Sequence, residues 1–349
     1  MERISVIRSQ IPKMSSAPPI DAPVTQTEAV LASARRGGEL ARFFAPHARA
    51  QERTAEFFGA EIRNPNTRAA YLTAATRFAH WAETKGLELT RLRPLQVAAY
   101  TEQLQQVYAA PSVKQHLAAL RMLFDYLVRG GVIEMNPAAS VRGPKYVIKK
   151  GKTPVLGAEE ARYLLSSICI EGETGQPVII GLRDRALMGI MAYTFARVSA
   201  VTQMRVEDYF QQGKRWWFRL HEKGGKYHEV PAHHKAEEFV DAWLRESGLV
   251  ERPKLPLFPS FDRNGCLSDR PLYRQDVLRM IKRRAVAAGL PRSTGCHTFR
   301  ATGITAYLEN GGTIEKAQAI AAHESPRTTK LYDRTSDTLT LDEIERIAI

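Results

Sequence analysis

The spacing of apolar residues between positions 48 and 140 is that of amphipathic helices. One helix is predicted to start after Asn64-Pro65 and to end at Gly86, and a second follows Arg93-Pro94. A third ends at Gly130-Gly131. The apolar residues of the first and third helices recur at helical spacing: Tyr71, Leu72, Ala75, Phe78, Ala79 and Trp81, then Leu117, Leu120, Phe124 and Leu127. This part of the chain is therefore predicted to form a helical domain.

The pattern from about residue 155 to 335 predicts helices around one short β region. L-M-G-I-M-A-Y-T-F is nearly all apolar, which is typical of a buried helix and too short to span a membrane. K-R-W-W-F-R-L and Y-H-E-V-P-A-H flank the turn H-E-K-G-G-K, and Gly224-Gly225 favours a tight hairpin there. We therefore expect a mainly α fold with a small β-sheet, in two domains, for which 349 residues suffice.

Three further segments complete the expected organisation. Residues 1–45 are rich in Ser, Ala and Pro and are predicted to form a flexible tail, followed by the helical domain at 46–140. Residues 141–154 hold five basic residues with Gly and Pro, and form a linker that either follows a phosphate backbone or is simply solvated. After the mixed domain at 155–335, residues 336–349 are predicted to form a C-terminal helix with Leu339, Leu341, Ile344 and Ile347 at near-helical spacing.

Charge and cysteine content limit the function classes. The chain has 50 basic and 37 acidic residues, a formal charge of +13, which favours a polyanionic partner, either nucleic acid or an acidic membrane surface. The N-terminus lacks the continuous apolar stretch of a secretory signal. Cys169, Cys266 and Cys296 lie far apart, which indicates neither a zinc site nor a disulfide framework. We therefore expect a cytoplasmic protein in a reducing setting.

Two kinds of site can be set aside from the sequence. Gly151-Lys152-Thr153 is superficially similar to a phosphate-binding loop, but Tyr146 stands where that motif needs a glycine, and Pro154 blocks the helix that should follow. This excludes a P-loop NTPase. His228, His233 and His234 come without a ligand set of recognisable spacing, and no carboxylate cluster suits paired Mg²⁺. We therefore predict no metal site.

Five polar residues in the second half of the chain form the candidate active site. Arginine is always charged and its planar fork can hold two phosphate oxygens, while a tyrosine hydroxyl can attack phosphorus. Each residue alone has an ordinary explanation, such as a surface helix position or a packed core side chain. Their order and joint spacing indicate chemistry on a phosphodiester. The five are Arg197, expected at the end of the apolar helix, His297 and Arg300 on one helical face, His323, and Tyr332.

These motifs resemble those of the tyrosine recombinase (integrase) family over nearly the whole folded chain. R-D-R-A-L…T-F-A-R-V-S-A is similar to the family's R-D-x-A-L…T-G-L-R-[IV]-S-E box, which makes Arg197 its first catalytic arginine. The family's H-x-x-R falls on His297 and Arg300. A-A-H-E-S-P-R-T-T-K-L-Y is similar to L-G-H-x-S-x-x-T-T-x-x-Y, which gives His323 and the nucleophile Tyr332.

The family's hairpin lysine is the sixth candidate. E-K-G-G-K-Y-H-E-V-P is similar to the family's G-K-G-x-K-x-R-x-V-P, which points to Lys223, with Lys226 as its rival in the same turn. The segment that ends in E-M-N-P-A…V-R-G-P-K resembles the family's core-binding domain and linker. The resemblance thus implies a helical, SAM-like core-binding domain followed by an α+β catalytic domain.

The resemblance also implies a reaction. Tyr332 attacks the scissile phosphate to give a 3′-phosphotyrosyl link and a free 5′-hydroxyl. Because a phenol has an ordinary pKa of about 10, it is a poor nucleophile at neutral pH and needs a base, for which His297 is the candidate. Arg197, Arg300 and His323 stabilise the phosphate oxygens, and Lys223 protonates the leaving oxygen. Neither ATP nor a metal cofactor is required, because the phosphotyrosine retains the bond energy.

The expected function is therefore site-specific DNA recombination through a Holliday junction, as in mobile genetic elements of bacteria. The implied partners are double-stranded DNA with paired sites, a homotetramer on the synapsed DNA, and accessory DNA-bending proteins. The C-terminal helix either docks on a neighbouring protomer or packs on its own domain. The protein is expected in the bacterial cytoplasm and at the nucleoid when it acts.

Three departures from the family pattern keep other readings open. Ala200 replaces the acidic residue three positions after the first arginine, Ala322 replaces the glycine before the second histidine, and Ala301 follows Arg300 where the family often has histidine. All six candidate groups remain, so we expect activity. The alternatives are DNA relaxation of the type IB topoisomerase kind and a non-catalytic DNA-binding accessory protein, which the loss of the acid at position 200 would favour.

Overall fold

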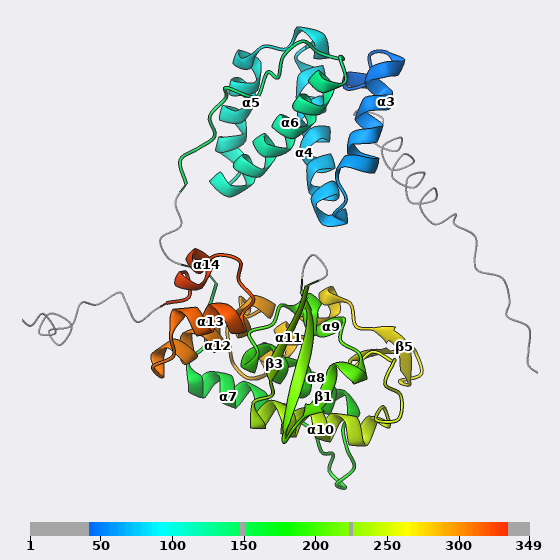
Figure 1. Ribbon diagram of the computed structural model, residues 1–349, viewed down its shortest axis with the longest axis vertical. Coiled ribbons are helices and arrows are strands. Elements are labelled where there is room, and N and C mark those ends of the chain that lie inside the picture. The colour runs from blue at the N-terminus through cyan, green and yellow to red at the C-terminus, as the bar shows by residue number, and fades with distance from the viewer. Residues whose placement is uncertain (1–41, 147–150, 152, 223–225, 334–349) are drawn as a thin grey trace, which may run out of the picture. The chain divides into compact units, whose positions relative to one another are not determined.

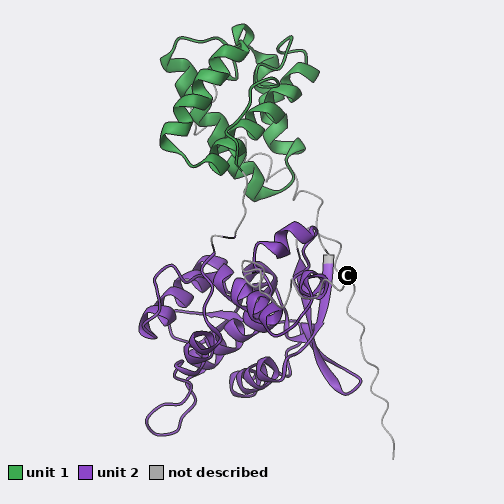
Figure 2. Ribbon diagram, turned by 90° about the vertical axis from the view of Figure 1, so that its left-hand side faces the viewer, with its two compact units in different colours: residues 1–147 green, residues 148–349 purple. Residues whose placement is uncertain are grey.

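The chain folds into two compact units. The computed structural model describes residues 42–146, 151, 153–222 and 226–333, with only the backbone described for Lys226. Contacts between Cα atoms divide the chain at residues 147 and 148, and Figure 2 colours the two units separately. The C-terminal helix expected at 336–349 lies outside the described residues, as do the first 41 positions of the expected tail.

Between residues 42 and 146, every regular element of the first unit is helical, as the apolar spacing predicts (Figure 1). Asn64 begins one helix by accepting hydrogen bonds from the backbone N–H groups of Asn66 and Thr67, at 2.9 and 3.2 Å, with Pro65 in the first turn. At the end of another helix, Gly131 adopts a left-handed φ of 65°. The elements are α3 (Ala48–Glu56), a π-helical turn (Phe57–Glu61), α4 (Pro65–Thr84), a 3₁₀ turn (Leu89–Arg91), α5 (Pro94–Val107) and α6 (Ala110–Arg129).

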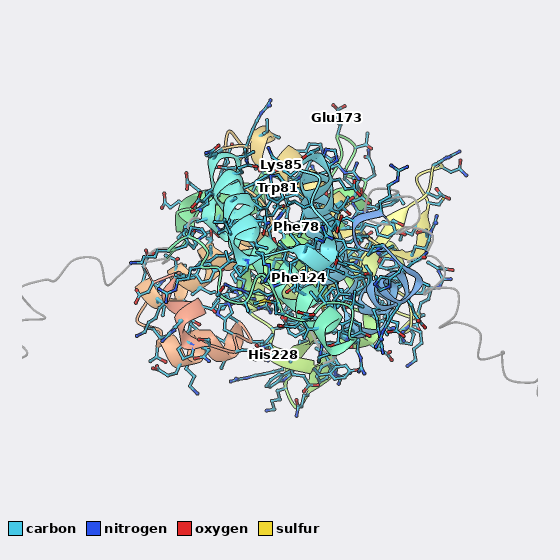
Figure 3. The ribbon with its side chains drawn as sticks, turned by 90° about the horizontal axis from the view of Figure 1, so that it is seen from above. Phe78, Trp81, Lys85, Phe124, Glu173 and His228 are labelled. Carbon is cyan, nitrogen blue, oxygen red and sulfur yellow. The ribbon has the colours of Figure 1, made fainter. Side chains whose placement is uncertain are left out.

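Aromatic side chains fill the core of this unit. Phe78, labelled with Phe124 in Figure 3, is fully buried. Its ring meets those of Phe124 and Tyr100 edge to face, with centroids 5.7 and 5.0 Å apart. Phe43 and Phe44 belong to the same core, 4% and 0% exposed. Packed structure therefore begins before the expected boundary between residues 45 and 46.

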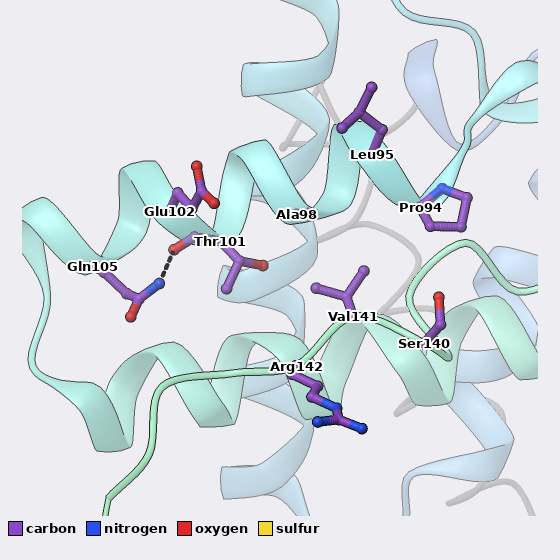
Figure 4. Close-up of a pocket in the computed structure, with 9 residues that line it drawn as sticks. All are labelled: Pro94, Leu95, Ala98, Thr101, Glu102, Gln105, Ser140, Val141 and Arg142. Carbon is purple, nitrogen blue, oxygen red and sulfur yellow. Dashed lines mark hydrogen bonds between the residues drawn. The ribbon is translucent and has the colours of Figure 1, made fainter.

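A shallow hollow lies beside α5 in the first unit. Figure 4 shows residues 140–142 running along this helix, with a hydrogen bond of 3.4 Å from the Gln105 side chain to the Thr101 carbonyl. Apart from Glu102 and Arg142, the residues that line it are uncharged. We assign it no chemistry.

The second unit is built around one buried helix, α8. Ten of its fifteen residues are buried, as expected for the apolar stretch, and α10 and α12 pack against it. Within the described ranges, no helix combines the length and the apolar composition needed to cross a bilayer. The helices are α7 (Ala158–Ser166), α8 (Ile179–Tyr193), α9 (Val198–Thr202), a 3₁₀ turn (Val206–Asp208), α10 (His234–Ser247), α11 (Arg274–Ala287), α12 (Cys296–Glu309), α13 (Ile314–Ile320) and α14 (Pro326–Lys330).

The predicted hairpin is confirmed, but it is only part of the β structure. β2 (Arg215–Glu222) and β3 (Lys226–Pro231) pair antiparallel, and the pairing places Glu222 opposite Lys226. β1 (Tyr209–Gln212) joins them through a turn at Gly213, whose φ is 62°, and β4 (Pro259–Phe261) pairs with β5 (Leu267–Pro271). The expectation of a single β region was therefore wrong, because strands of three to five residues carry too few positions to show an alternating pattern.

Candidate active site

Five of the six predicted residues come together in the second unit. Arg197 lies at the N-cap of α9, so the expectation that it ends the apolar helix was wrong: α8 stops at Tyr193, and a loop intervenes. The positive charges of Arg197 and Arg300 both act on the imidazoles of His297 and His323. The rings of His323 and Tyr332 are nearly parallel, with centroids 6.0 Å apart, and Tyr332 also interacts electrostatically with Arg300.

Arg300 is the buried centre of this group. It projects from α12, is 2% exposed, and donates hydrogen bonds to the carbonyl oxygens of Phe195 and, at 2.5 Å, Ala321. Burial and the charge of Arg197 lower the pKa of Arg300 to about 10, so it stays protonated at neutral pH. A guanidinium has five N–H donors, so a ligand can still receive hydrogen bonds from it.

Two strained residues shape the backbone that holds Arg300. Phe195 and Ala322 adopt left-handed φ values of 56° and 47°, which cost a non-glycine residue free energy. In the motif comparison both stand where the family has glycine. The strain is supported by packing, because Phe195 belongs to a small apolar cluster with Ile304, Leu308, Ala317 and Ala321.

Close approach of two helices sets the position of α12. A Cβ atom at Gly303 would lie 2.2 Å from the carbonyl oxygen of Ala192 and 2.6 Å from the ring of Phe195. Only glycine therefore lets this face of α12 meet the end of α8 and the loop that leads to Arg197.

The two histidines are neutral at neutral pH. His323 is 7% exposed, and its Nδ1 shares a hydrogen bond of 2.9 Å with the Thr329 hydroxyl, which is fully buried. Burial, and then Arg300 and Arg197, lower the pKa of His323 to about 3. His297 reaches solvent, yet the surrounding protein and the same two arginines lower its pKa as well.

Arg197 has an acidic partner that the sequence did not reveal. Its Nη1 atom donates a hydrogen bond of 2.6 Å to Oε2 of Glu222, the last residue of β2. The Arg197 side chain is 36% exposed and that of Glu222 only 7%. Ala200, where the family has its acid, is 1% exposed in the core of the unit. The available signal was Glu222 itself, which stands where the family's hairpin motif has glycine.

Backbone contacts fix the position of Tyr332 just after α14. Its N–H donates to the Thr329 carbonyl at 2.9 Å, and its own carbonyl accepts from the Thr305 hydroxyl of α12 at 2.9 Å. The side chain is half-buried beside the apolar cluster under Arg300. Thr305 and Thr329 are thus supporting residues that the sequence interpretation did not include.

The lysine candidates lie in the sequence next to the facing ends of β2 and β3. Lys223 lies outside the described residues. The backbone of Lys226 forms the first position of β3, opposite Glu222. Because Lys223 directly follows Glu222, it is one peptide bond from the partner of Arg197.

The histidines near the hairpin have partners other than a metal. The ring of His233 stacks on Tyr193 and on His234, with centroids 4.2 Å apart in both cases. Nε2 of His228 donates a hydrogen bond of 2.9 Å to the carbonyl oxygen of Ile320. Over the described part of the chain, no three or more His, Cys, Asp or Glu side chains are grouped so as to hold a metal ion.

Comparison with protein families identifies both units. Residues 155–338 match the phage integrase family, and residues 57–131 match the phage integrase N-terminal SAM-like domain. Tyrosine recombinase XerD of Pseudomonas aeruginosa is 29% identical over 272 residues, which cover 76% of this chain and 86% of that protein. XerD of Corynebacterium glutamicum is 28% identical over 283 residues, which cover 78% and 89%.

Solved structures show the same fold. XerH site-specific recombinase bound to palindromic difH substrate, in a post-cleavage complex, matches with a TM-score of 0.68 and 18% identity over 93% of this chain and 87% of that one. A lambda integrase dimer bound to a COC′ core site matches with a TM-score of 0.60 and 19% identity over 83% and 79%. The predicted fold class, a helical SAM-like domain followed by an α+β domain, is confirmed.

Proposed function

Because the chain belongs to the phage integrase family and is a tyrosine-type DNA recombinase, we propose that it recombines specific DNA sites through a 3′-phosphotyrosyl intermediate. The observation that carries this proposal is the convergence of Arg197, Arg300 and His323 beside Tyr332. Two guanidinium groups, a buried neutral imidazole and a phenol are the groups that attack on a phosphodiester requires.

In the proposed cleavage step the Tyr332 oxygen attacks the scissile phosphorus. A bond forms between the phenolic oxygen and phosphorus, the bond from phosphorus to the 5′ oxygen breaks, and that oxygen takes up a proton. The 5′-hydroxyl of a second strand then reverses the step and releases tyrosine. Two such exchanges, one for each pair of strands, pass through a Holliday junction. The phosphotyrosyl bond keeps the energy of the phosphodiester, so the reaction needs neither ATP nor a metal cofactor.

The histidines and arginines take different parts in this proposal. His297 accepts the phenolic proton, which its lowered pKa allows because the imidazole is neutral at neutral pH. Thr329 donates its hydroxyl to Nδ1 of His323, which leaves the proton on Nε2 to donate to a phosphate oxygen. Arg197 and Arg300 neutralise the other oxygens, and loss of either contact should slow cleavage roughly 100- to 1000-fold.

Lys223 is proposed as the acid that protonates the leaving 5′ oxygen. Replacing that oxygen by sulfur tests this role, because a thiolate leaves without a proton. Lys223→Ala should cleave an ordinary duplex slowly and a duplex with a 5′-bridging sulfur at the wild-type rate. If Lys226→Ala shows this rescue and Lys223→Ala does not, the acid is Lys226.

The proposed substrate is duplex DNA carrying paired sites. Two of the structural relatives were solved with a bound substrate or site, namely the palindromic difH substrate of XerH and the COC′ core site of lambda integrase. The basic linker at 141–154 would follow the backbone, and the residues at 336–349 would dock on a neighbouring protomer in a tetramer. With a formal charge of +13, affinity for DNA should fall steeply with salt. Accessory DNA-bending proteins and a site of action in the bacterial cytoplasm belong to the same proposal.

Strand exchange is the direct test of recombination. A duplex that the protein selects from a randomised pool supplies the site, and two labelled copies of different length report the exchange. Recombinant lengths and a four-way junction on native gels are expected. Relaxation of supercoiled plasmid that lacks the selected site would instead indicate a topoisomerase, and binding without any cleavage would indicate an accessory protein.

A further inference from the structure

Glu222, the acid that contacts Arg197, comes from a distant part of the chain, not from the position three residues later. The two residues are 25 positions apart, one at the N-cap of α9 and the other at the end of β2. The residue three positions after Arg197, where the family has its acid, is Ala200, and its side chain is buried in the core. The acid beside this arginine therefore comes from the sheet and not from the helix that Arg197 begins.

The geometry of the pair suits a positioning role. The Glu222 side chain is 7% exposed, on a strand that pairs with β3 from Trp217 to Glu222, so it is held in place. Nη1 is the atom of Arg197 that bonds to Glu222, and the side chain remains 36% exposed. The other edge of the guanidinium can thus turn towards a phosphate while the carboxylate fixes the plane of the fork.

Glu222 also compensates charge within the site. Arg197 lowers the pKa of Arg300 by repulsion, and Glu222 acts on Arg300 in the opposite direction. Without that carboxylate, two guanidinium groups would face each other in a partly desolvated site before any phosphate arrives. The carboxylate offsets part of this repulsion on Arg300 in the free protein.

We propose that Glu222 is the positioning residue of Arg197 and replaces the acid that position 200 lacks. This inference rests on the proposed function, since it assigns Arg197 to the scissile phosphate. It adds that the residue which directly precedes Lys223 in the sequence orients the first arginine.

Another ion pair of the same sheet provides the matched control. Arg219 of β2 donates to Glu229 of β3 at 2.9 Å, but the Glu229 side chain is 42% exposed, against 7% for Glu222. Glu229→Gln therefore removes a carboxylate and an arginine contact from the sheet without touching the site. Glu222→Gln keeps the shape of the side chain and removes its charge, and Glu222→Asp keeps the charge on a shorter side chain.

The experiment measures cleavage, binding and stability of each variant. Cleavage is the single-turnover rate of covalent adduct formation on a nicked duplex of the selected sequence, and binding is the Kd for the same duplex without the nick. We expect Glu222→Gln to cleave about 10- to 100-fold more slowly, as a displaced catalytic group does. Its Kd and melting temperature should stay close to the wild-type values, Glu222→Asp should recover part of the rate, and Glu229→Gln should match the wild type.

Two results would overturn the inference. One is wild-type cleavage by Glu222→Gln. The other is a parallel loss of cleavage, binding and melting temperature in that variant, which would make Glu222 a contact of the fold alone. Failure of the proposed function is separate, because in that case the wild-type protein itself would form no adduct.

Discussion

His323 is buried beside two arginines, and its lowered pKa makes the stability of the folded protein sensitive to acid. Its pKa in the folded protein is about 3, whereas an unfolded histidine titrates near its ordinary value of about 6.5. Between these values the unfolded chain binds a proton that the folded site does not accept. Stability should therefore be unaffected by this group above the ordinary value and should fall as the pH drops below it.

His323→Gln tests that linkage. The unfolding free energy, measured in urea from about pH 7 to about pH 4, should decline less steeply in the variant than in the wild type, because glutamine has no proton to gain. Parallel curves for the two proteins would contradict the assignment of a lowered pKa to His323.

The left-handed backbone at Ala322 should have a measurable effect on the unfolding free energy. A left-handed φ costs an alanine about 1–2 kcal/mol, while a glycine adds about 0.4–1 kcal/mol of entropy to the unfolded chain. Ala322→Gly should therefore raise the unfolding free energy by about 0.5 kcal/mol. Ala319→Gly, at an exposed position of α13, should lower it by about 0.5 to 1 kcal/mol. Equal losses in both variants would show that Ala322 is unstrained.

At the scale of single residues, the sequence indicated the five side chains that come together in the second unit. The family motifs fix their identity and their order along the chain. The sequence interpretation missed Glu222 because this partner of Arg197 lies 25 positions away, at the end of β2, and no local spacing connects positions 197 and 222. It also missed that Phe195 takes a glycine position, because left-handed backbone at a bulky residue is stabilised only by tertiary packing.

At the scale of elements, a buried ion network joins α8 to α11. One carboxylate oxygen of Asp184, which is fully buried, accepts from Arg183 at 2.9 Å, and the other accepts from Arg284 at 2.8 and 3.1 Å. Removal of one partner from such a network leaves uncompensated charge in the core. The helix that leads to the Arg197 loop is thereby tied to α11.

Asp184→Asn should lower the unfolding free energy by about 3 kcal/mol, measured by urea denaturation. The control is Asp276→Asn, which removes an exposed pair with Arg279 in α11 and should change stability by less than about 1 kcal/mol. A loss at Asp184 no larger than that at Asp276 would contradict a structural role for the network.

The sequence predicted best the helices whose ends are marked by proline or glycine. Asn64-Pro65, Arg93-Pro94 and Gly130-Gly131 mark the ends of α4, α5 and α6 in the structure as in the sequence. β1, β4 and β5 were missed because they are short and pair within the fold of the unit. The short helix α9 was missed for the same reason, and with it the true place of Arg197.

At the scale of the whole molecule, the chain joins a SAM-like helical unit to a catalytic unit and carries a formal charge of +13. The net charge was readable from composition, and the fold class from the apolar pattern and the motifs. The DNA sequence that the protein recognises was not, because base recognition depends on which side chains reach the groove edges.

Covalent attachment of Tyr332 to DNA is the central claim, and a nicked suicide duplex of the selected sequence tests it most directly. After cleavage the short fragment diffuses away and the protein stays linked to the DNA. The wild type should form an adduct on denaturing gels, and so should Tyr307→Phe, which alters a tyrosine of the neighbouring apolar cluster. Tyr332→Phe should bind the duplex with unchanged Kd and form no adduct. An undiminished adduct from Tyr332→Phe, or none from a wild-type protein that binds the duplex, would contradict the account.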